Sequence, residues 1–267
     1  MNKFYIQTAL FILSIFAYAN NGALAAEPAP GEDIKDQPLS PYATSEEIYE
    51  KNKHLLCKFP EKAIKVGNIM NDAVKHLEYY ATTKDGYEPY LQNPTDSISY
   101  YIKKFDNETN IIKAHLNIYD SSQYNAIINR IWNPNAPNIY NKGAAKILQV
   151  YNPNLMFIRQ ICEKDSKGYQ KYFYAFVSKT EISKDKTIII MTSANVNDRN
   201  HANIEYNNPI LDFAGLYKIF LQPKNDITDK NYVRIYVNLA GYIIEKKGDN
   251  LEITYIESVS DIPILII

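Results

Sequence analysis

The segment 171–178 carries apolar or aromatic side chains on both of its faces, and this feature constrains the fold more than any other. Its period of two is typical of a β-strand, in which successive side chains point to opposite faces of a sheet. The two sets are Tyr172, Tyr174 and Phe176 on one face, and Phe173, Ala175 and Val177 on the other. Because apolar surface is driven out of water, a sheet that contains this strand must be covered on both sides.

Apolar residues spaced by three and four predict a long helix that begins at Pro60 and reaches Tyr80. Its apolar stripe consists of Ala63, Val66, Met70, Ala73, Leu77 and Tyr80. A single stripe of this kind must pack on another element, and proline suits the first turn of a helix. A shorter helix is expected from Thr44 to about Leu56, because Thr44 and Glu47 have the spacing of a capping box.

The rest of the chain has mainly strand patterns, with one further helix over 121–132. The expected strands are 97–105, 109–119, 146–151, 155–163, 171–180, 187–195, 232–245 and 251–258, with a possible short helix over 210–220. Helices followed by many antiparallel strands predict an α+β fold, with one curved sheet and a long helix that grips it. Because a strongly curved sheet does not lie flush on a helix, we expect a gap that holds a ligand.

The first 25 residues have the pattern of a secretory signal peptide. Lys3 is followed by an apolar stretch that reaches Ala19 and by small residues before a cleavage site near Ala25. The apolar stretch is shorter than the roughly 20 residues that a transmembrane helix needs. Residues 26–43 are rich in proline and charge, which predicts a flexible leader. A single domain over 44–267 is expected to follow, and the mature chain is expected to be soluble and secreted.

Two cysteines, Cys57 and Cys162, remain after the expected cleavage. Secretion allows a disulfide between them, because the extracellular compartment is oxidising. Their separation in the sequence does not fix their distance in space, so one bridge and two buried thiols both remain possible.

Charge and motif content argue against nucleic-acid binding and against catalysis. The chain has 29 basic and 30 acidic residues, and no block of lysine and arginine stands out as a phosphate-binding surface. The four histidines are His54, His76, His115 and His201. They lack metal-ligand spacing, and the chain contains neither a nucleophile elbow nor a glycine-rich phosphate loop. We therefore expect no enzyme activity, no catalytic residue, no metal and no cofactor.

The closing hairpin over 232–258 places a carboxylate on an otherwise apolar face. By two-fold alternation Glu257 shares that face with Leu251, Ile253 and Tyr255. A carboxylate in such a place is costly unless another group pairs with it. Arg159, isolated within LMFIRQIC, offers a charge-assisted hydrogen bond either to Glu257 or to a phosphate.

The segment VRIYVNLAGYIIEKKGDNLEITYIESVS resembles the last two strands of a START domain, the lipid-transfer family with the helix-grip fold. Gly241 and Tyr242 match the family's glycine followed by an aromatic residue, and the run 253–257 matches its Val/Ile-Thr-Trp/Tyr-Val/Ile-Glu pattern. The segment YNAIINRIWNPN is similar to the family's helix that ends in Trp-Asp, with Trp132 and Asn133 in those places. The resemblance implies a curved antiparallel sheet around a long helix, with a central apolar cavity.

Several separated blocks also resemble the fam-a proteins of Plasmodium, the malaria parasites, between Met1 and about Ser260. These blocks are MNKFYIQTALFILSIFAYANN, TSEEIYEKNKHLLC, LQVYNPNL, QKYFYAF and KTIIIMTSANVND. This narrower resemblance implies a protein that is secreted and exported to the parasitophorous vacuole or the host cell. It also implies a phospholipid ligand, with phosphatidylcholine as the usual candidate, and transient contact with a membrane surface during lipid transfer.

The resemblance implies a cavity wall made by the closing hairpin and extended by neighbouring strands. The expected lipid-binding residues are Trp132, Arg159, Tyr174, Phe176, Tyr242, Ile244, Ile253, Tyr255 and Glu257. The same residues would serve equally well as ordinary core, because period-two apolar residues fill the core of most sheets.

START domains end in a long amphipathic helix that closes the cavity, whereas Ser258 is followed here only by VSDIPILII. We therefore expect this helix to be missing and the apolar wall to favour self-association. The alternative is a secreted or exported, non-catalytic interaction protein or antigen that has a degenerate START-like fold and no transfer activity.

Overall fold

The computed structural model of the chain describes residues 42–92, 98–106, 109–136, 145–164, 168–198, 206–212, 214, 217–221 and 232–261. The expected signal peptide lies outside these residues. So do the leader up to residue 41 and the segment 262–267, so the expectation that the closing helix is missing is not tested. None of the helices in the described ranges is both long enough and apolar enough to span a bilayer.

Three of the predicted helices form, although the first is divided into an α-helix and a 3-10 turn. The helical elements are α2 (Ser45–Lys51), the 3-10 turn η1 (Lys53–Leu55), α3 (Pro60–Thr82), the 3-10 turn η2 (Ser121–Gln123) and α4 (Tyr124–Trp132). The capping box of α2 is complete, because Glu47 N donates to Thr44 Oγ1 at 3.2 Å and Thr44 N donates to Glu47 Oε2 at 2.8 Å. Pro60 occupies the first turn of α3, where its missing N–H leaves no hydrogen bond unmade.

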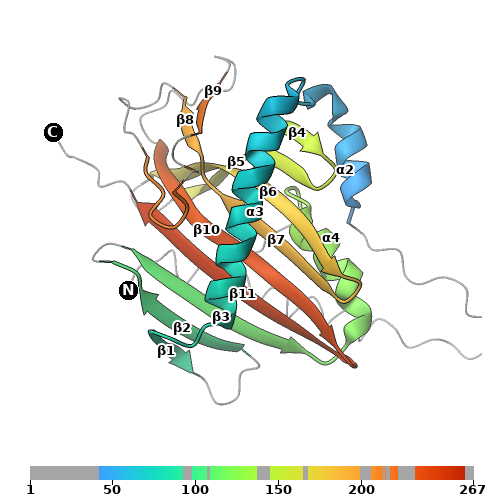
Figure 1. Cartoon of the computed structure of the whole chain (residues 1–267), viewed down its shortest axis with the longest axis vertical. Coiled ribbons are helices and arrows are strands. Elements are labelled where there is room, and N and C mark those ends of the chain that lie inside the picture. The colour runs from blue at the N-terminus through green and yellow to red at the C-terminus, as the bar shows by residue number, and fades with distance from the viewer. Residues whose placement is uncertain are drawn as a thin grey trace, which may run out of the picture.

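Nine strands form one strongly curved sheet in the order β1-β2-β3-β11-β10-β7-β6-β5-β4 (Figure 1). Their bounds are β1 (Tyr87–Gln92), β2 (Ile98–Lys104), β3 (Asn110–Ile118), β4 (Ala145–Asn152), β5 (Leu155–Lys164), β6 (Gln170–Ser183), β7 (Lys186–Thr192), β10 (Tyr232–Lys247) and β11 (Asn250–Asp261). Neighbours in this order are antiparallel, and the start of β10 also pairs in parallel with β6. The predicted α+β class with one large antiparallel sheet is confirmed.

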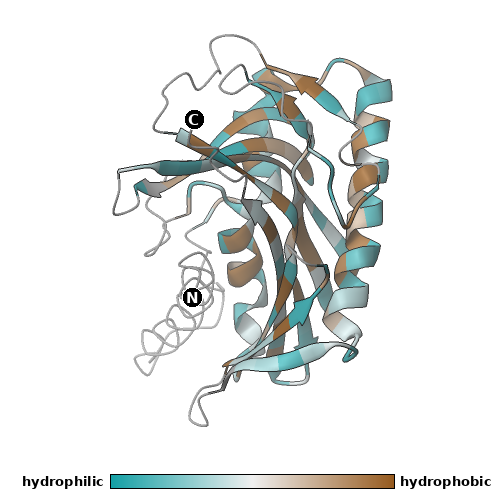
Figure 2. Ribbon diagram, turned by 90° about the vertical axis from the view of Figure 1, so that its left-hand side faces the viewer, coloured by the Kyte–Doolittle hydropathy of each residue, from teal (hydrophilic) through white to brown (hydrophobic). Residues whose placement is uncertain are grey.

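The two faces of the sheet are covered by different helices (Figure 2). The long helix α3 packs on one face, through Val66, Ala73 and Leu77, against fully buried rings such as Tyr172 and Phe176. The short helix α4 lies on the other face, toward which the sheet curves (Figure 2). We call these the α3 face and the concave face. The requirement for cover on both sides, predicted from 171–178, is thus confirmed.

Packed side chains fill the space between α3 and the sheet. Val66, Ala73 and Leu77 are fully buried there. The gap that we expected beneath the long helix is therefore absent at these residues, because the convex side of a curved sheet lets a helix approach closely. The concave side faces away from α3, so the search for a ligand-binding surface moves to that face.

Charged side chains fix the C-terminal half of α3 to the sheet. Lys113 Nζ donates to the carbonyl oxygens of Ala81 at 3.4 Å and Thr83 at 2.6 Å, at the negative end of the helix dipole. Burial lowers the pKa of Lys113, with nearby lysines as the lesser cause. Lys186 on β7 pairs with Glu78 of α3 at 2.8 Å.

Three short strands depart from the sequence prediction. β1 was not expected; it lies at the sheet edge, where Pro89 is tolerated because the outer side of an edge strand needs no N–H donor. The short helix expected over 210–220 is wrong at its described residues, which form turns and the strand β9 (Lys218–Phe220). β9 pairs in parallel with β8 (Asn195–Asn197) and forms a small second sheet.

Gly241 allows β10 and β7 to approach closely where the sheet bends. A Cβ at this position would lie 2.6 Å from the carbonyl oxygen of Ile189 and 3.0 Å from Cα of Ile190, both of which are backbone atoms of the neighbouring strand. The sequence singled out Gly241 only through its family motif, whereas the structure supplies the physical reason.

We predict that Gly241→Ala lowers the free energy of unfolding by about 1–3 kcal/mol, because the new methyl group forces the two strands apart. The matched control is Gly67→Ala on α3, where no atom lies within 4 Å of an added Cβ. This control should be neutral or stabilise the protein by up to about 1 kcal/mol. Urea denaturation measures both, and equal effects of the two changes would contradict the close approach at Gly241.

Cys57 and Cys162 are free thiols of intermediate exposure, so the structure shows no bridge between them, and neither residue is fully buried. Cys162 lies on β5, and burial raises the pKa of its thiol to about 11, with a smaller contribution from the charge of Glu257. The thiolate is the reactive form of cysteine. The thiol of Cys162 should therefore react slowly with electrophiles at neutral pH.

We predict that iodoacetamide at pH 8 modifies Cys162 much more slowly than Cys57. The rate at Cys162 should rise about tenfold per pH unit between pH 8 and 10, because the thiolate fraction rises in that proportion below the pKa. Peptide mass spectrometry of the alkylated protein follows the two sites separately. Labelling of Cys162 at pH 8 as fast as that of Cys57 would show that its thiol is not buried.

Candidate functional site

The closing hairpin forms the centre of the concave face. Tyr242 on β10 pairs directly with Tyr255 on β11, and Ile244 pairs with Ile253. The two tyrosine rings lie 4.6 Å apart between centroids at an interplanar angle of 40°. All four side chains belong to the apolar cluster of the concave face. Two-fold alternation in both strands explains this placement, since the four residues have the same parity in the pairing register.

Helix α4 adds Trp132 to this cluster at its last residue. The indole is 2% exposed, and its Nε1–H is buried with no hydrogen-bond partner among the described residues. A buried donor without a partner costs about 1–3 kcal/mol. Tyr124, at the other end of the helix, instead shares a hydrogen bond of 2.8 Å with Thr187 Oγ1. The concave face therefore contains one N–H donor whose hydrogen-bonding capacity is unused.

The hairpin places two charged residues on this face. Glu257 is 4% exposed, and Lys246 lies with Nζ 4.8 Å from the ring centre of Tyr124. Glu257 stands opposite Ala240 on β10 and Ile112 on β3. Burial raises the pKa of Tyr242 and Tyr255 well above the usual value for tyrosine, and the nearby carboxylate of Glu257 raises both further. Both phenols therefore stay protonated over the physiological range and can serve as hydrogen-bond donors.

Three of the residues predicted for the cavity wall lie on the α3 face instead. Tyr174 and Phe176 pack in the cluster beneath α3. Arg159 pairs across the strands with Tyr174 and points to the same side. The expectation that they extend the hairpin's wall is wrong, and so is the expected pairing of Arg159 with Glu257. Alternation fixed which residues share a face, but a strand that is apolar on both sides does not reveal which face meets which helix.

The α3 face around these residues holds a buried polar cluster. Asp198 is fully buried and forms an ion pair with Arg234, and it accepts a hydrogen bond of 2.7 Å from Tyr172 Oη. The guanidinium of Arg234 also lies 5.8 Å from the ring centres of Tyr172 and Tyr174. Burial raises the pKa of Tyr174 to about 12, although Arg159 and Arg234 act in the opposite direction. The cluster attaches the segment after β7 to the sheet, which is a structural role.

The concave face also includes residues that the sequence prediction missed. They are the other side of β6 and the inward residues of β5 and β3, namely Phe173, Ala175, Val177, Met156, Ile158, Ala114 and Leu116. The alternation of these strands groups them correctly. Only the position of α4 shows that this group, and not the set around Tyr174, continues the hairpin's wall.

The described residues contain no group of three or more histidine, cysteine, aspartate or glutamate side chains arranged to hold a metal ion. His115 lies on β3 with Nδ1 3.1 Å from Thr254 Oγ1, and burial lowers its pKa. This contact lies in the sheet between β3 and β11. The groups on the concave face suit contact with hydrocarbon, and they include the indole N–H of Trp132 and the carboxylate of Glu257.

No protein-family model and no curated protein sequence matches the chain. Among solved structures, human StAR-related lipid transfer protein 5 superposes with a TM-score of 0.52 at 10% identity, over 74% of this chain and 83% of that one. Human STARD10 superposes with a TM-score of 0.45 at 13% identity, over 72% of this chain and 67% of that one. A STAR-related lipid transfer protein from Xanthomonas axonopodis superposes with a TM-score of 0.41 at 11% identity, over 67% of this chain and 86% of that one.

The match to StAR-related lipid transfer protein 5 shows a similar fold. At 10% identity it does not show a shared function. The narrower resemblance to fam-a proteins stays a prediction. From its sheet and helices, this chain has the helix-grip fold of the START domains.

Proposed function

We propose that the protein binds a phospholipid on its concave face and moves it between membranes. The observation that carries this proposal is an apolar wall of hairpin and helix residues that contains an unpartnered indole N–H and a buried carboxylate. The START fold supports it, because the similar structure at a TM-score of 0.52 is named as a lipid transfer protein.

The chemistry of the wall suits an amphiphile. Each acyl CH₂ that leaves water for an apolar surface gains about 0.8 kcal/mol, which offsets its removal from a bilayer. The hairpin side chains and Trp132 would contact the acyl chains and the glycerol region. The indole Nε1–H would donate to an ester or phosphate oxygen of the lipid, which removes the cost of leaving it unbonded.

Glu257 gives the wall a preference for a ligand with positive charge. A buried carboxylate beside two phenol rings favours a cationic group, because ring faces and carboxylates both attract cations. This fits phosphatidylcholine, the candidate that the fam-a resemblance implies. No bond of the lipid is made or broken in this role.

The remaining parts of the proposal come from the sequence. The signal-peptide pattern supports secretion, and the fam-a resemblance supports export to the parasitophorous vacuole or the host cell. Transfer requires transient contact with a membrane surface. Self-association through the apolar wall, which was expected from the sequence, is also part of the proposal.

The first test is native mass spectrometry of the purified protein, followed by transfer of fluorescent phosphatidylcholine between unilamellar vesicles. We expect a co-purifying phospholipid and protein-dependent transfer. A chain that folds normally but carries no lipid and transfers none would contradict the proposal. That result would favour the alternative of a non-catalytic interaction protein with a START-like fold.

We predict that Trp132→Phe weakens binding of fluorescent phosphatidylcholine about three- to tenfold. The change keeps an aromatic ring and removes the N–H donor, whose hydrogen bond to a ligand is worth about 0.5–1.5 kcal/mol. The matched control is Tyr79→Phe on α3, a ring that is 53% exposed on the other side of the molecule. Unchanged affinity in a folded Trp132→Phe protein would show that the indole does not contact the lipid.

We further predict that Tyr255→Ala reduces lipid uptake while the far-ultraviolet circular dichroism spectrum is retained. Tyr255 packs against Tyr242 on the wall, so its loss removes surface that we propose for ligand contact. Tyr119→Ala, at a ring that is 79% exposed, is the control. A collapsed spectrum would identify Tyr255 as core and not as ligand-contact surface.

A further inference from the structure

A second hollow lies on the opposite side of the sheet, along the outer surface of α3. Its volume is about 610 Å³, within the range of small-molecule sites. One wall is α3 and the other is Tyr217. Its polar lining residues are Lys65, Asn68, Asn71, Asp72, Lys75 and Tyr217. Because α3 covers the convex side, this hollow is separate from the concave face, and it is unrelated to lipid binding.

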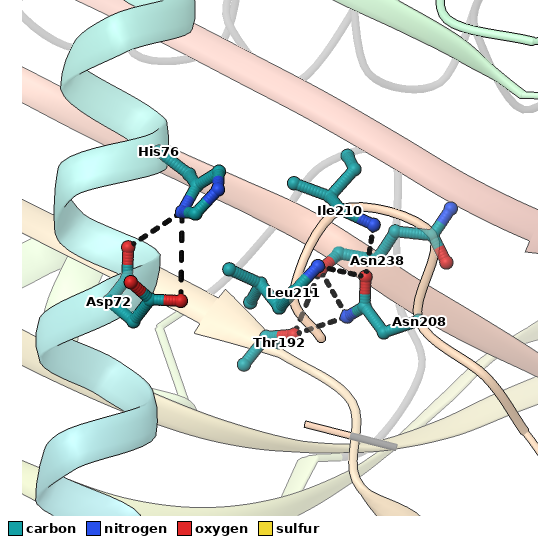
Figure 3. Close-up of polar contacts among 7 residues, drawn as sticks. All are labelled: Asp72, His76, Thr192, Asn208, Ile210, Leu211 and Asn238. Carbon is teal, nitrogen blue, oxygen red and sulfur yellow. Dashed lines mark hydrogen bonds and ion pairs between the residues drawn. The ribbon is translucent and has the colours of Figure 1, made fainter. Parts of the chain in front are cut away.

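A buried polar network fixes the segment that precedes Tyr217. Asn208 Oδ1 accepts hydrogen bonds from the backbone N–H groups of Ile210 and Leu211, at 2.9 and 3.0 Å. Asn208 Nδ2 donates to the carbonyl oxygen of Asn238 on β10 at 2.8 Å and to Thr192 Oγ1 on β7 at 3.1 Å (Figure 3). The turn is thus held against the sheet on the α3 face by four hydrogen bonds from one side chain.

The ring of Tyr217 has its own anchor. It packs edge to face on Phe176, with ring centres 5.8 Å apart. Burial raises the pKa of Tyr217, so its hydroxyl stays protonated. The wall opposite α3 is therefore preformed, which lowers the entropic cost of binding a ligand there.

The helix side of the hollow presents hydrogen-bonding groups in a regular row. Lys65, Asn68 and Asp72 follow at spacings of three and four and so share one stripe of α3. The apolar floor is Ile69, which is 7% exposed. His76 Nδ1 donates to the carbonyl oxygen of Asp72 at 3.0 Å and lies 3.8 Å from its carboxylate (Figure 3).

Charge is arranged along this row with cations at both ends. Lys65 and Lys75 are ten residues apart, which is about 15 Å along a helix. Asp72 and the amides of Asn68 and Asn71 lie between them. Amides donate and accept, and a carboxylate accepts, so the middle of the row suits a ligand rich in hydroxyl groups. The ends suit negative groups that are too far apart to belong to a single phosphate or carboxylate.

We propose that this hollow binds an acidic oligosaccharide. Sugar hydroxyls would pair with Asn68, Asn71 and Asp72, a sugar ring would lie against Tyr217, and Lys65 and Lys75 would each hold a sulfate or carboxylate group. An extended peptide fits less well, because peptide grooves use apolar side-chain pockets or a free strand edge. This hollow offers one apolar floor residue, and α3 has no free backbone donors along its middle.

The test is isothermal titration calorimetry of the full folded domain with a heparin-derived tetrasaccharide, alongside a neutral tetrasaccharide of glucose. We expect the sulfated probe to bind and the neutral probe to bind at least tenfold more weakly. Asn68→Ala and Asn71→Ala should each weaken binding of the sulfated probe several-fold, although neither change removes a positive charge. Absence of binding, or equal binding of both probes, would overturn the proposal.

The control separates a built site from general attraction of a polyanion to lysine. Lys62→Ala removes a positive charge from α3 outside the hollow, whereas Lys75→Ala removes one inside it. Lys75→Ala should lower the affinity for the sulfated probe about tenfold, and Lys62→Ala should lower it by less than twofold. Equal losses of affinity in the two variants would show non-specific electrostatic binding and would overturn the proposed site. Tighter binding of an acidic peptide with the same charge as the sulfated probe would also overturn it. Circular dichroism confirms that each variant is folded.

Discussion

The whole structure depends on the burial of a sheet that is apolar on both faces. β6 places aromatic rings under α3 and a second apolar set on the concave face. One helix cannot cover both sides, so the chain must supply a second cover. α3 spans the convex side with its full length, whereas α4 is only nine residues long. Helix α2 adds Ile48 to the concave cluster, but no helix as long as α3 covers that face among the described residues. The concave face is therefore the one that we propose for a ligand.

Buried polar groups on the α3 face are mostly paired. Asp198 and Arg234 form an ion pair there, and the side-chain oxygen and nitrogen of Asn208 both form hydrogen bonds. Pairing of this kind is usual in a protein core. Each face also contains a buried polar atom without a hydrogen-bond partner among the described residues, namely Tyr174 Oη on the α3 face and Trp132 Nε1 on the concave face. The indole N–H stands on the wall that we propose for the lipid, where a ligand oxygen would remove the cost of leaving it unbonded.

The two proposals therefore concern opposite sides of one sheet and different chemistry. The concave face offers hydrocarbon contact, while the outer surface of α3 offers amides, ammonium groups and a carboxylate. The sheet and α3 separate them, so a substitution in one region leaves the other region's contacts in place. This independence allows lipid binding and oligosaccharide binding to be tested in the same protein without one result deciding the other.

The sequence by itself determined most of the elements and which side chains share a face of each. The 3.6-residue stripe gave α3, the capping box gave the start of α2, and two-fold alternation grouped Tyr242 with Ile244 and Tyr174 with Phe176. These are local properties, since spacing along a helix or strand fixes which side chains share a side. The fold class followed from their order, and the motif around Gly241 pointed to the START fold.

Only the tertiary structure decided which face meets which helix. Tyr174 and Phe176 lie under α3, away from Tyr242, because β6 is apolar on both sides and its alternation is the same whichever side turns inward. Edge strand β1 and the pairing of β8 with β9 also depend on partners distant in the chain. The Asn208 network and the hollow beside α3 arise for the same reason, since hydrogen bonds between residues 16 and 30 positions apart leave no periodic trace in a sequence.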